Sequence, residues 1–227
     1  MAFGAVAGRP RNLASVLAAA RWREARDRRG HAERIFSLLD RVLGRKGLAP
    51  VGLVAVSGGP GSFTGLRVGM AVAKAFARFG NIPLVAVPTL EAMAAEAALR
   101  VRAPLYVPVV DAKRGEVYTA PFRPGRDGVV GAGRTAVREP SALRAGLPAG
   151  ALVVEEPARA RTVAALGFLA FAAGERADPD RLVPVYVRRP EAVEKMRPGC
   201  SSNPGAVVSG AAHRWNWFRS PPGWSRP

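Results

Sequence analysis

The stretch best suited to chemistry is a glycine-rich turn with two hydroxyl side chains, GGPGSFTG at Gly58–Gly65. Glycines such as Gly59 and Gly61 can adopt backbone angles that are closed to other residues. Ser62 or Thr64 can cap a following helix by accepting a hydrogen bond from one of its first N–H groups. The remaining N–H groups, at the positive end of that helix, would then be free to bind an anion such as a phosphate group.

The established phosphate-binding motifs do not match this turn. A P-loop requires Gly-Lys followed by Ser or Thr, and a dinucleotide fingerprint that starts at Gly59 would place Thr64 where Gly or Ala is needed. A tight turn that closes a strand onto a helix explains the glycines at least as well. The sequence leaves both interpretations open, with Gly59, Gly61 and Ser62 as candidate nucleotide contacts.

Ser62 does not have the surroundings of a catalytic nucleophile. A nucleophile elbow has glycine two residues before the serine, and Pro60 stands at that position. No histidine and acid can be paired with Ser62 from the sequence, as a catalytic triad requires. We therefore expect neither hydrolase activity nor any catalytic residue.

The elements that position the turn are visible in the segment Val51–Val87. An apolar run at Leu53–Val56 predicts a strand that is buried on both faces and stops at Ser57. A helix-forming run continues to about Phe79, and a second apolar run begins at Ile82. Together they predict a strand, turn, helix and strand of the kind found in parallel sheets.

The expected helix has one face that is almost bare of side chains. Small residues recur there every four positions: Gly65, Gly69, Ala73 and Ala77. Apolar area beside this ridge comes from Leu66, Met70 and Phe76. Another backbone can approach such a ridge more closely than the usual ~8–10 Å between helix axes. That backbone would belong either to the chain's own sheet or to a helix of another protein.

A second helix is expected within His31–Leu43, and it has apolar residues on two faces. One face holds Ile35, Leu38 and Val42, and the other holds Phe36, Leu39 and Leu43. A helix that lies on a sheet with its back to water needs only one apolar stripe. The pattern therefore predicts a helix covered on both sides, either inside its own domain or by a partner.

Four stretches are informative when taken together. They are GGPGSFTGLRVGMAVAKAFA with the following IPLVAVPTLEAMA, RRGHAERIFSLLDRVL at Arg28–Leu43, VVDAKRGEVYTAPFR at Val109–Arg123, and VPVYVRRPEAVEK at Val183–Lys195. In sequence and in order they resemble the TsaB (YeaZ) family. The resemblance covers roughly residues 28–195.

The resemblance implies an α/β protein with a two-lobed actin-like ATPase or RNase-H-like fold of the ASKHA type, in which mixed sheets are flanked by helices. Residues 1–104 would form an N-terminal lobe that carries partner-binding helices, and residues 105–195 a C-terminal lobe. Residues 196–227 show no hydrophobic period and are expected to be a disordered tail. Residues 1–29 are atypical, because AFGAVAGRPRN replaces a family strand that ends in Asp-Thr-Ser or Asp-Thr-Ala.

Several further elements are expected along the chain. A family strand matches Ser15–Ala18, and other strands are expected at Leu105–Val110, Glu116–Phe122, Leu152–Val154 and Val183–Val187. An alanine-rich helix is expected at Ala158–Ala173.

The resemblance also implies a function. In this family's pathway TsaD transfers a threonylcarbamoyl group to the adenosine beside the anticodon in tRNA, and TsaB binds TsaD and keeps it competent, with the ATPase TsaE joining the pair. The chain would be a non-catalytic, cytoplasmic scaffold with no cofactor of its own, and ATP or ADP would bind only in the assembled complex. The expected contact residues are Ile35, Phe36, Leu39, Leu43, Gly65, Arg67, Gly69, Met70, Ala73 and Phe76. The same helices would support a homodimer when TsaD is absent.

The resemblance further implies that a metal site has been lost. TsaD has two histidines four residues apart on the matching helix, and by motif their positions here are Thr89 and Met93. Neither side chain binds a hard divalent metal well. The histidines His31 and His213 and the single Cys200 show no recognisable metal-ligand spacing, so we expect no metal.

Two carboxylates flank a turn after the run Leu105–Val110. Asp111 and Glu116 could line a cleft between the lobes, where relatives place nucleotide contacts. Equally, they could cap the turn and pair with Lys113 or Arg114, which we favour.

The composition limits the remaining classes. No run reaches the ~18 apolar residues of a membrane span. The chain has 34 Lys and Arg against 17 Asp and Glu, a formal net charge of +17 that favours contact with polyanions. Compositional bias with weak electrostatic help for tRNA explains this excess best. A nucleotide-dependent phosphotransferase and a charge-driven tRNA-binding protein are the alternatives to a scaffold.

Overall fold

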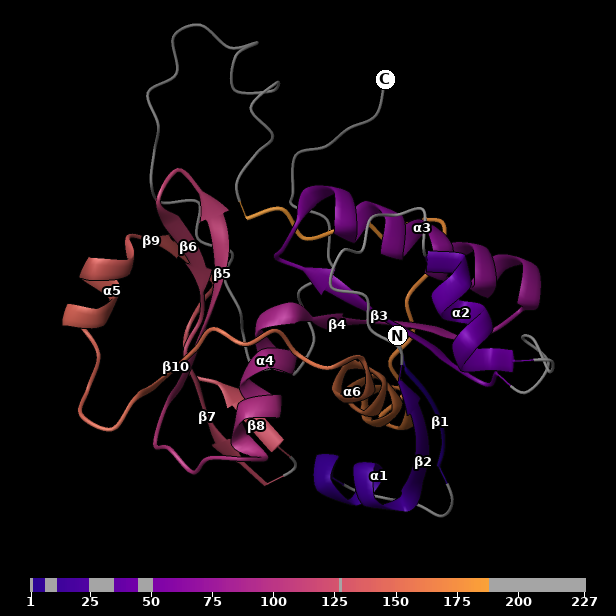
Figure 1. Ribbon diagram of the computed structural model, residues 1–227, viewed down its shortest axis with the longest axis horizontal. Coiled ribbons are helices and arrows are strands. Elements are labelled where there is room, and N and C mark those ends of the chain that lie inside the picture. Colours follow the sequence, from indigo (N-terminus) through magenta and orange to yellow (C-terminus); the bar gives the residue numbers. More distant parts are fainter. Residues whose placement is uncertain (1, 7–11, 25–34, 45–50, 127, 188–227) are drawn as a thin grey trace, which may run out of the picture. The chain divides into compact units, whose positions relative to one another are not determined.

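The central unit of the structure is the parallel pair β3 (Val54–Gly59) and β4 (Leu84–Pro88), joined by helix α3 (Phe63–Gly80). In the computed structural model, residues 2–6, 12–24, 35–44, 51–126 and 128–187 are described (Figure 1). The expected strand, turn, helix and strand are therefore confirmed, with the first strand continuing past Ser57 into the glycines. Helix α3 ends at Asn81, whose left-handed backbone donates its N–H to the carbonyl of Ala77.

A second, larger sheet follows along the chain. Its strands are β5 (Tyr106–Lys113), β6 (Glu116–Thr119), β7 (Phe122–Gly125), β8 (Gly128–Gly131), β9 (Ala136–Arg138) and β10 (Leu152–Val154). Their order is β8-β7-β5-β6-β9, and β10 pairs in parallel with β5. The strands expected from the apolar runs are confirmed here, except that the run Glu116–Phe122 is divided between β6 and β7. Helix α5 (Pro140–Ala145) follows β9.

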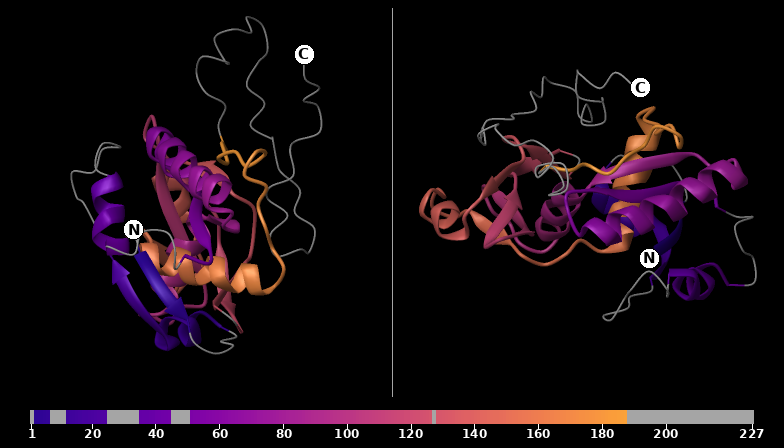
Figure 2. Two further views of the ribbon diagram at one scale, coloured as in Figure 1. Left: turned by 90° about the vertical axis from the view of Figure 1, so that its right-hand side faces the viewer. Right: turned by 90° about the horizontal axis from the view of Figure 1, so that it is seen from above.

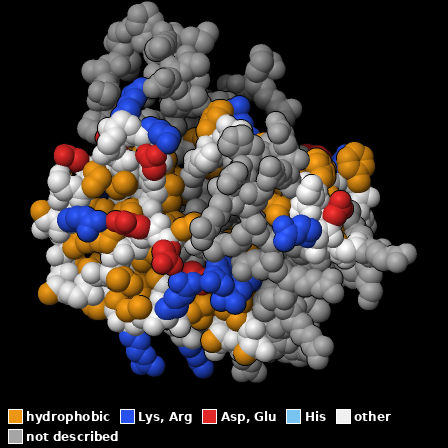
Figure 3. Space-filling model, viewed as in Figure 1, with side chains coloured by type: hydrophobic (Ala, Val, Ile, Leu, Met, Phe, Trp, Pro, Cys, Tyr) orange, Lys and Arg blue, Asp and Glu red, His pale blue; other side chains and the backbone are white. Residues whose placement is uncertain are grey.

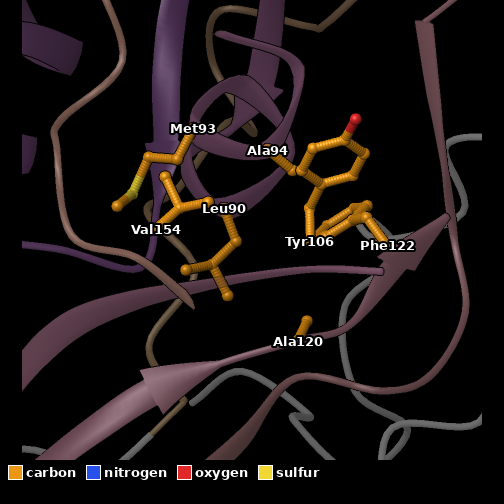
Figure 4. Packing of buried hydrophobic residues seen from close by; sticks show 7 residues of the cluster. All are labelled: Leu90, Met93, Ala94, Tyr106, Ala120, Phe122 and Val154. Atoms are coloured by element: carbon orange, nitrogen blue, oxygen red, sulfur yellow. The ribbon is translucent and has the colours of Figure 1, made fainter. Parts of the chain in front are cut away.

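Helix α4 (Thr89–Ala98) connects the two sheets and packs on both. It contacts β3 and β4 of the first sheet and β5, β7, β8 and β10 of the second. Leu90 and Met93 pack against Tyr106 and Phe122 in a cluster of buried apolar side chains (Figure 4). Because α4 has apolar residues around most of its circumference, it can be buried from both sides.

Helix α6 (Ala160–Ala172) returns to the first sheet, which corrects the expected lobe boundary. It contacts β3 and β4, although its residues were assigned to a C-terminal lobe of residues 105–195. Gly167 faces Ala55 so closely that a side chain on Gly167 would meet the Ala55 methyl group. The second lobe is therefore an insertion, residues 105–155, and the chain after it belongs to the first lobe again.

Residues 176–187, which we call the strap, run beside α3 (Figure 2). The strand expected at Val183–Val187 was wrong, because this segment joins no sheet ladder. It is held by single hydrogen bonds: the N–H of Ala177 donates to the carbonyl of Leu84, and that of Val185 donates to Gly58. Leu182 is buried in the core that α3 forms with β4.

The first 24 residues contain an antiparallel pair, β1 (Ala2–Val6) and β2 (Ala20–Glu24), with helix α1 (Leu13–Ala19) between them. The strand expected at Ser15–Ala18 was wrong, because these residues lie in α1. Asn12 explains the helix: its side-chain oxygen accepts the N–H of Ser15, while the Ser15 hydroxyl oxygen accepts the N–H of Asn12. This reciprocal cap satisfies two backbone donors at the helix start.

Helix α2 (Ile35–Leu43) lies within the expected second helix and contacts β1. His31, the boundary near residue 29 and the tail at 196–227 lie outside the described residues. Among the residues that the structure does describe, no helix is both long and apolar enough to cross a membrane.

Candidate functional site: the α3 surface and the glycine-rich turn

The glycine-rich turn is crossed by the strap. The carbonyl oxygen of Val185 lies 2.8 Å from the position that a Cβ atom would take on Gly59, whose φ of +108° few other residues adopt. The N–H of Val185 donates to the Gly58 carbonyl at 2.8 Å. Close packing of backbone on backbone therefore explains Gly59 without any phosphate group.

Ser62 performs the capping role that the sequence allowed. Its hydroxyl oxygen accepts the N–H of Gly65 at 3.3 Å, and α3 begins at the next residue. A Cβ atom added to Gly61 would make only an ordinary contact with Leu66, so packing does not require a glycine there. The predicted use of Gly59, Gly61 and Ser62 by a nucleotide remains a prediction, and Gly59 and Ser62 each have a structural role besides.

The carboxyl ends of β3 and β4 are joined by two hydroxyl groups. Ser57 Oγ and Thr89 Oγ1 lie 2.7 Å apart, within hydrogen-bond distance. Met93, the other position where the sequence predicts a lost metal ligand, is buried in the core under the second sheet. Among the described residues, no three His, Cys, Asp or Glu side chains gather as a metal site would require.

Helix α3 has three faces with different neighbours. The face on the first sheet is formed by Leu66, Met70, Ala73 and Ala77. Met70 is 2% exposed and Ala73 is 5% exposed, so these two residues are corrected from the predicted partner contacts. Both belong to the chain's own core. Met70 lies one turn after the buried Leu66, and Ala73 is reached because the four-residue ridge drifts around the helix toward the sheet.

The second face of α3 meets the strap. Arg67 Nε donates to Tyr186 Oη at 2.9 Å, and the Arg67 guanidinium lies 3.7 Å from the centre of the Phe63 ring. The Phe63 and Tyr186 rings lie 5.5 Å apart between centres. We call these three residues the clasp. Arg67, a predicted partner contact, is thus engaged within the chain, although it stays exposed.

Beyond the clasp, α3 makes two further contacts with the strap. Lys74 Nζ donates to the Leu182 carbonyl at 3.2 Å, and Arg78 pairs with Asp180 at 3.2 Å. Sequence reasoning missed Phe63, because the Tyr186 ring that it contacts lies far away along the chain. The spacing of Phe63 and Arg67, four residues apart on a helix, was the one available signal.

The third face of α3 points away from both the sheet and the strap. We call Gly65, Gly69 and Phe76 the free face. Within the described part of the chain, no atom lies within 4 Å of the position of a Cβ on Gly69, and a Cβ on Gly65 would meet only Ser62. Phe76 is half-buried. Phe79, which sequence reasoning did not select, is 90% exposed near the end of the helix.

Helix α2 presents part of its second apolar stripe to solvent. Phe36 is 63% exposed, while Ile35, Leu39 and Leu43 are half-buried. The principal contact of the helix among the described elements is β1. Phe36 is thus a large apolar side chain without cover from the described part of the chain.

Asp111 and Glu116 border a hollow of about 380 Å³ in the second lobe. Its other walls come from β5, β6, β10 and α5, among them Val109, Leu143 and Val153. Gly59, Gly61 and Ser62 are not among the residues that line this hollow, and a nucleotide contact of Asp111 or Glu116 remains a prediction. The two sets of residues stand on different sheets.

Asp111 pairs with its neighbour, as the favoured interpretation predicted. One carboxylate oxygen accepts the Lys113 backbone N–H and the other accepts Lys113 Nζ, both at 2.7 Å. The hydrogen bond from the Lys113 side chain lowers the pKa of Asp111, and the same bond raises the pKa of Lys113. Lys113 and Arg114 both have positive φ in this tight turn.

Lys and Arg side chains occur at several separate places on the face shown in Figure 3, with Asp and Glu between them. Carboxylates engage several of the described arginines, among them Arg78, Arg100, Arg144, Arg159 and Arg181. Part of the positive charge is therefore neutralised locally.

The architecture is an actin-like fold of the ASKHA type, and solved structures share it. YeaZ from Pseudomonas aeruginosa is similar with a TM-score of 0.65 and 25% identity, over 74% of this chain and 89% of that one. A second Pseudomonas aeruginosa structure, described as an uncharacterized protein with similarity to peptidase YEAZ, has a TM-score of 0.66 with the same identity and coverage.

Sequence comparison agrees with the structural likeness. The TsaD family model, described as tRNA N6-adenosine threonylcarbamoyltransferase, matches residues 25–172. The tRNA threonylcarbamoyladenosine biosynthesis protein TsaB of Escherichia coli (strain K12) is 34% identical over 44% of this chain and 45% of its own length. An uncharacterized protein of Mycobacterium tuberculosis (strain ATCC 25618 / H37Rv), Rv3421c, is 34% identical over 73% of this chain and 79% of its own length.

The chain therefore belongs to the TsaB (YeaZ) family. Its match spans less than half the length of the Escherichia coli relative. The part of this chain that the family model matches includes β3, the glycine-rich turn, α3 and the whole second lobe.

Proposed function

We propose that this chain acts in the biosynthesis of threonylcarbamoyladenosine in tRNA as a non-catalytic subunit that binds TsaD, with TsaE joining the pair. The name of the Escherichia coli relative supports the pathway. The observation that carries the role is the free face of α3, where Gly69 has open space around its Cβ position.

A small-residue surface on a regular helix suits a helix of another protein. Gly65 and Gly69 are one turn apart, so a partner helix crossing there can approach below the usual ~8–10 Å between axes. Phe76 and the exposed Phe79 lie on the following turns and offer apolar area beside the glycines. Aromatic side chains at the centre of such a contact commonly supply much of its binding energy.

The two helices predicted to bind the partner contribute differently. On α3 the contact set becomes Gly65, Gly69 and Phe76, because Arg67 lies on the strap-facing side of the helix. On α2 the exposed Phe36 is the side chain with most area to bury, and Ile35, Leu39 and Leu43 lie beside it. Burying an exposed phenylalanine contributes roughly 1.5–3 kcal/mol, which favours association of this face.

The proposal assigns this chain no chemistry of its own. The glycine-rich turn is occupied by the strap, and the Ser62 hydroxyl is engaged as a helix cap. ATP or ADP would bind only in the assembled complex. Calorimetry with ATP and magnesium on the isolated chain distinguishes this scaffold from a phosphotransferase, because tight binding with turnover would contradict the scaffold.

Binding to TsaD can be tested with one substitution on the free face. Gly69→Leu fills the open space and should abolish co-elution with TsaD, while the melting temperature of the isolated chain stays near that of the wild type. Gly131→Leu is the matched control, because Gly131 in β8 also has no atom within 4 Å of its Cβ position. An unchanged elution profile for Gly69→Leu, or equal loss in both variants, would count against the proposal.

A charge-driven tRNA-binding role predicts a different result. The isolated chain would bind tRNA tightly, and the affinity would fall steeply as salt is raised. Under our proposal the isolated chain binds tRNA weakly, and addition of TsaD is required for a stable complex. A filter-binding titration at two salt concentrations, with and without TsaD, separates the two.

A further inference from the structure

The chain passes between the two lobes twice. The first crossing, residues 99–105, follows α4, and the second, residues 155–159, leads from β10 into α6 (Figure 1). Rotation of one lobe against another requires a few residues in such crossings to change their backbone angles. The contacts of these two segments therefore decide whether the lobes can move.

A cluster of polar side chains joins the two crossings directly. Arg100, on the first crossing, donates to Glu156 Oε2 on the second crossing at 2.8 Å. The same guanidinium donates to Glu96 Oε1 on α4, also at 2.8 Å. One side chain thus ties together a helix and both segments that connect the lobes.

Glu96 is the centre of this cluster and is only 4% exposed. Its second oxygen accepts the hydroxyl of Thr162, which is fully buried on α6. Arg159, where the second crossing enters α6, places its Nε 3.7 Å from Glu96 Oε1. The Glu96 carboxylate therefore has partners on three separate segments, and its charge also raises the pKa of Arg100.

Hydrogen bonds from the second lobe also hold the first crossing. Tyr106, buried at the start of β5, donates its hydroxyl to the Val101 carbonyl at 2.8 Å and accepts the Ala103 N–H at 3.2 Å. The N–H of Leu152 donates to the Leu105 carbonyl at 2.8 Å. Several backbone groups of the crossing are thus engaged and cannot turn freely.

Stability alone does not explain why the Glu96 carboxylate is buried on α4. Ala92, Ala94 and Ala95 beside Glu96 are completely buried, so the surroundings of α4 are apolar. A well-packed apolar residue in place of a buried ion pair is often equally stable or more so. A polar cluster does, however, specify geometry, because its hydrogen bonds tolerate only small displacements.

We propose that Glu96, Arg100, Glu156 and Thr162 form an interlobe latch that holds both crossings together, so that the two lobes of this chain move as one rigid body. The α3 surface on the first lobe and the hollow beside Asp111 on the second are then kept at a fixed separation. Ligand-driven closure of the lobes is not part of this protein's mechanism.

The latch is tested by measuring the distance between the lobes. Spin labels are attached at Ala71→Cys on α3 and Ala142→Cys on α5, both exposed, in a Cys200→Ser background. Double electron–electron resonance on the full-length chain should give one narrow distance population. Arg100→Met removes the central guanidinium and should replace that population with a broad one.

Arg181→Met is the matched control, since Arg181 forms an ion pair with Asp178 inside the strap and touches neither crossing. It should leave the distance distribution narrow. A broad distribution in the parent protein, or an equally narrow one in Arg100→Met, would overturn the latch. If Arg100→Met does not fold, the exposed Glu156→Gln decides: loss of the single narrow population supports the latch, and its retention refutes it.

Discussion

The carbonyl oxygen of Val185 lies 2.8 Å from the position of a Cβ atom on Gly59, although the two residues are far apart in the chain. This contact gives the glycine-rich turn a structural purpose, because only a residue without a side chain lets the strap cross there. The adjacent hydrogen bond from the Val185 N–H to the Gly58 carbonyl fixes the crossing point. The strap in turn carries Tyr186 to the clasp on α3.

Gly59→Ala should destabilise the protein and loosen the strap. The methyl group would meet the Val185 carbonyl, and the positive φ of +108° is strained for alanine, which costs about 1–3 kcal/mol. Urea denaturation measures the loss, and hydrogen exchange at residues 182–187 locates it. Gly69→Ala is the control and should instead stabilise by up to about 1 kcal/mol, because it replaces a glycine inside an open helix face. Equal stability of the two variants would contradict this account.

Gly167→Ala should weaken the packing of α6 on β3. The added methyl group overlaps that of Ala55, and such overpacking costs about 1–3 kcal/mol. Ala55→Gly in the same chain removes the overlap, so the double variant should regain much of the loss. Thermal denaturation of the two single variants and the double variant measures this coupling. Strictly additive effects would show that the two residues do not meet.

Tyr186→Phe should release Arg67 while keeping the aromatic contact with Phe63. The substitution removes only the hydroxyl that accepts from Arg67 Nε. Since the pair is exposed, the free energy of unfolding should change by less than about 1 kcal/mol. The expected sign of release is faster solvent exchange of the Arg67 Nε–H in NMR spectra. An exchange rate identical to the wild type would argue that the clasp does not persist in solution.

The pairing of Asp111 with Lys113 should be visible in a pH titration. The hydrogen bond lowers the pKa of Asp111 below its ordinary 3.8, so the pair contributes stability above pH 3.8 and loses it as pH falls through the lowered pKa. Carboxyl chemical shifts measured by NMR should give this lower pKa for the wild type. Lys113→Met should return the pKa toward 3.8, and an unchanged value in that variant would refute the pairing.

Local patterns in the sequence determined the central unit. The alternation of apolar runs with a glycine-rich turn predicted β3, α3 and β4, and short-range chemistry predicted the Ser62 cap and the Asp111–Lys113 pair. Each of these depends on residues within a few positions of one another, so composition and spacing are sufficient. The same spacing identified Gly65 and Gly69 as a bare surface on α3.

Tertiary structure alone decided which predicted surfaces are free and where the chain returns. Met70 and Ala73 were predicted partner contacts, yet both are buried in the core that α3 forms with β4. The clasp joins Arg67 to a residue 119 positions away, and the latch joins Arg100 to Glu156, 56 positions away. No local period records such contacts, because they exist only after α6 and the strap have packed back onto the first sheet.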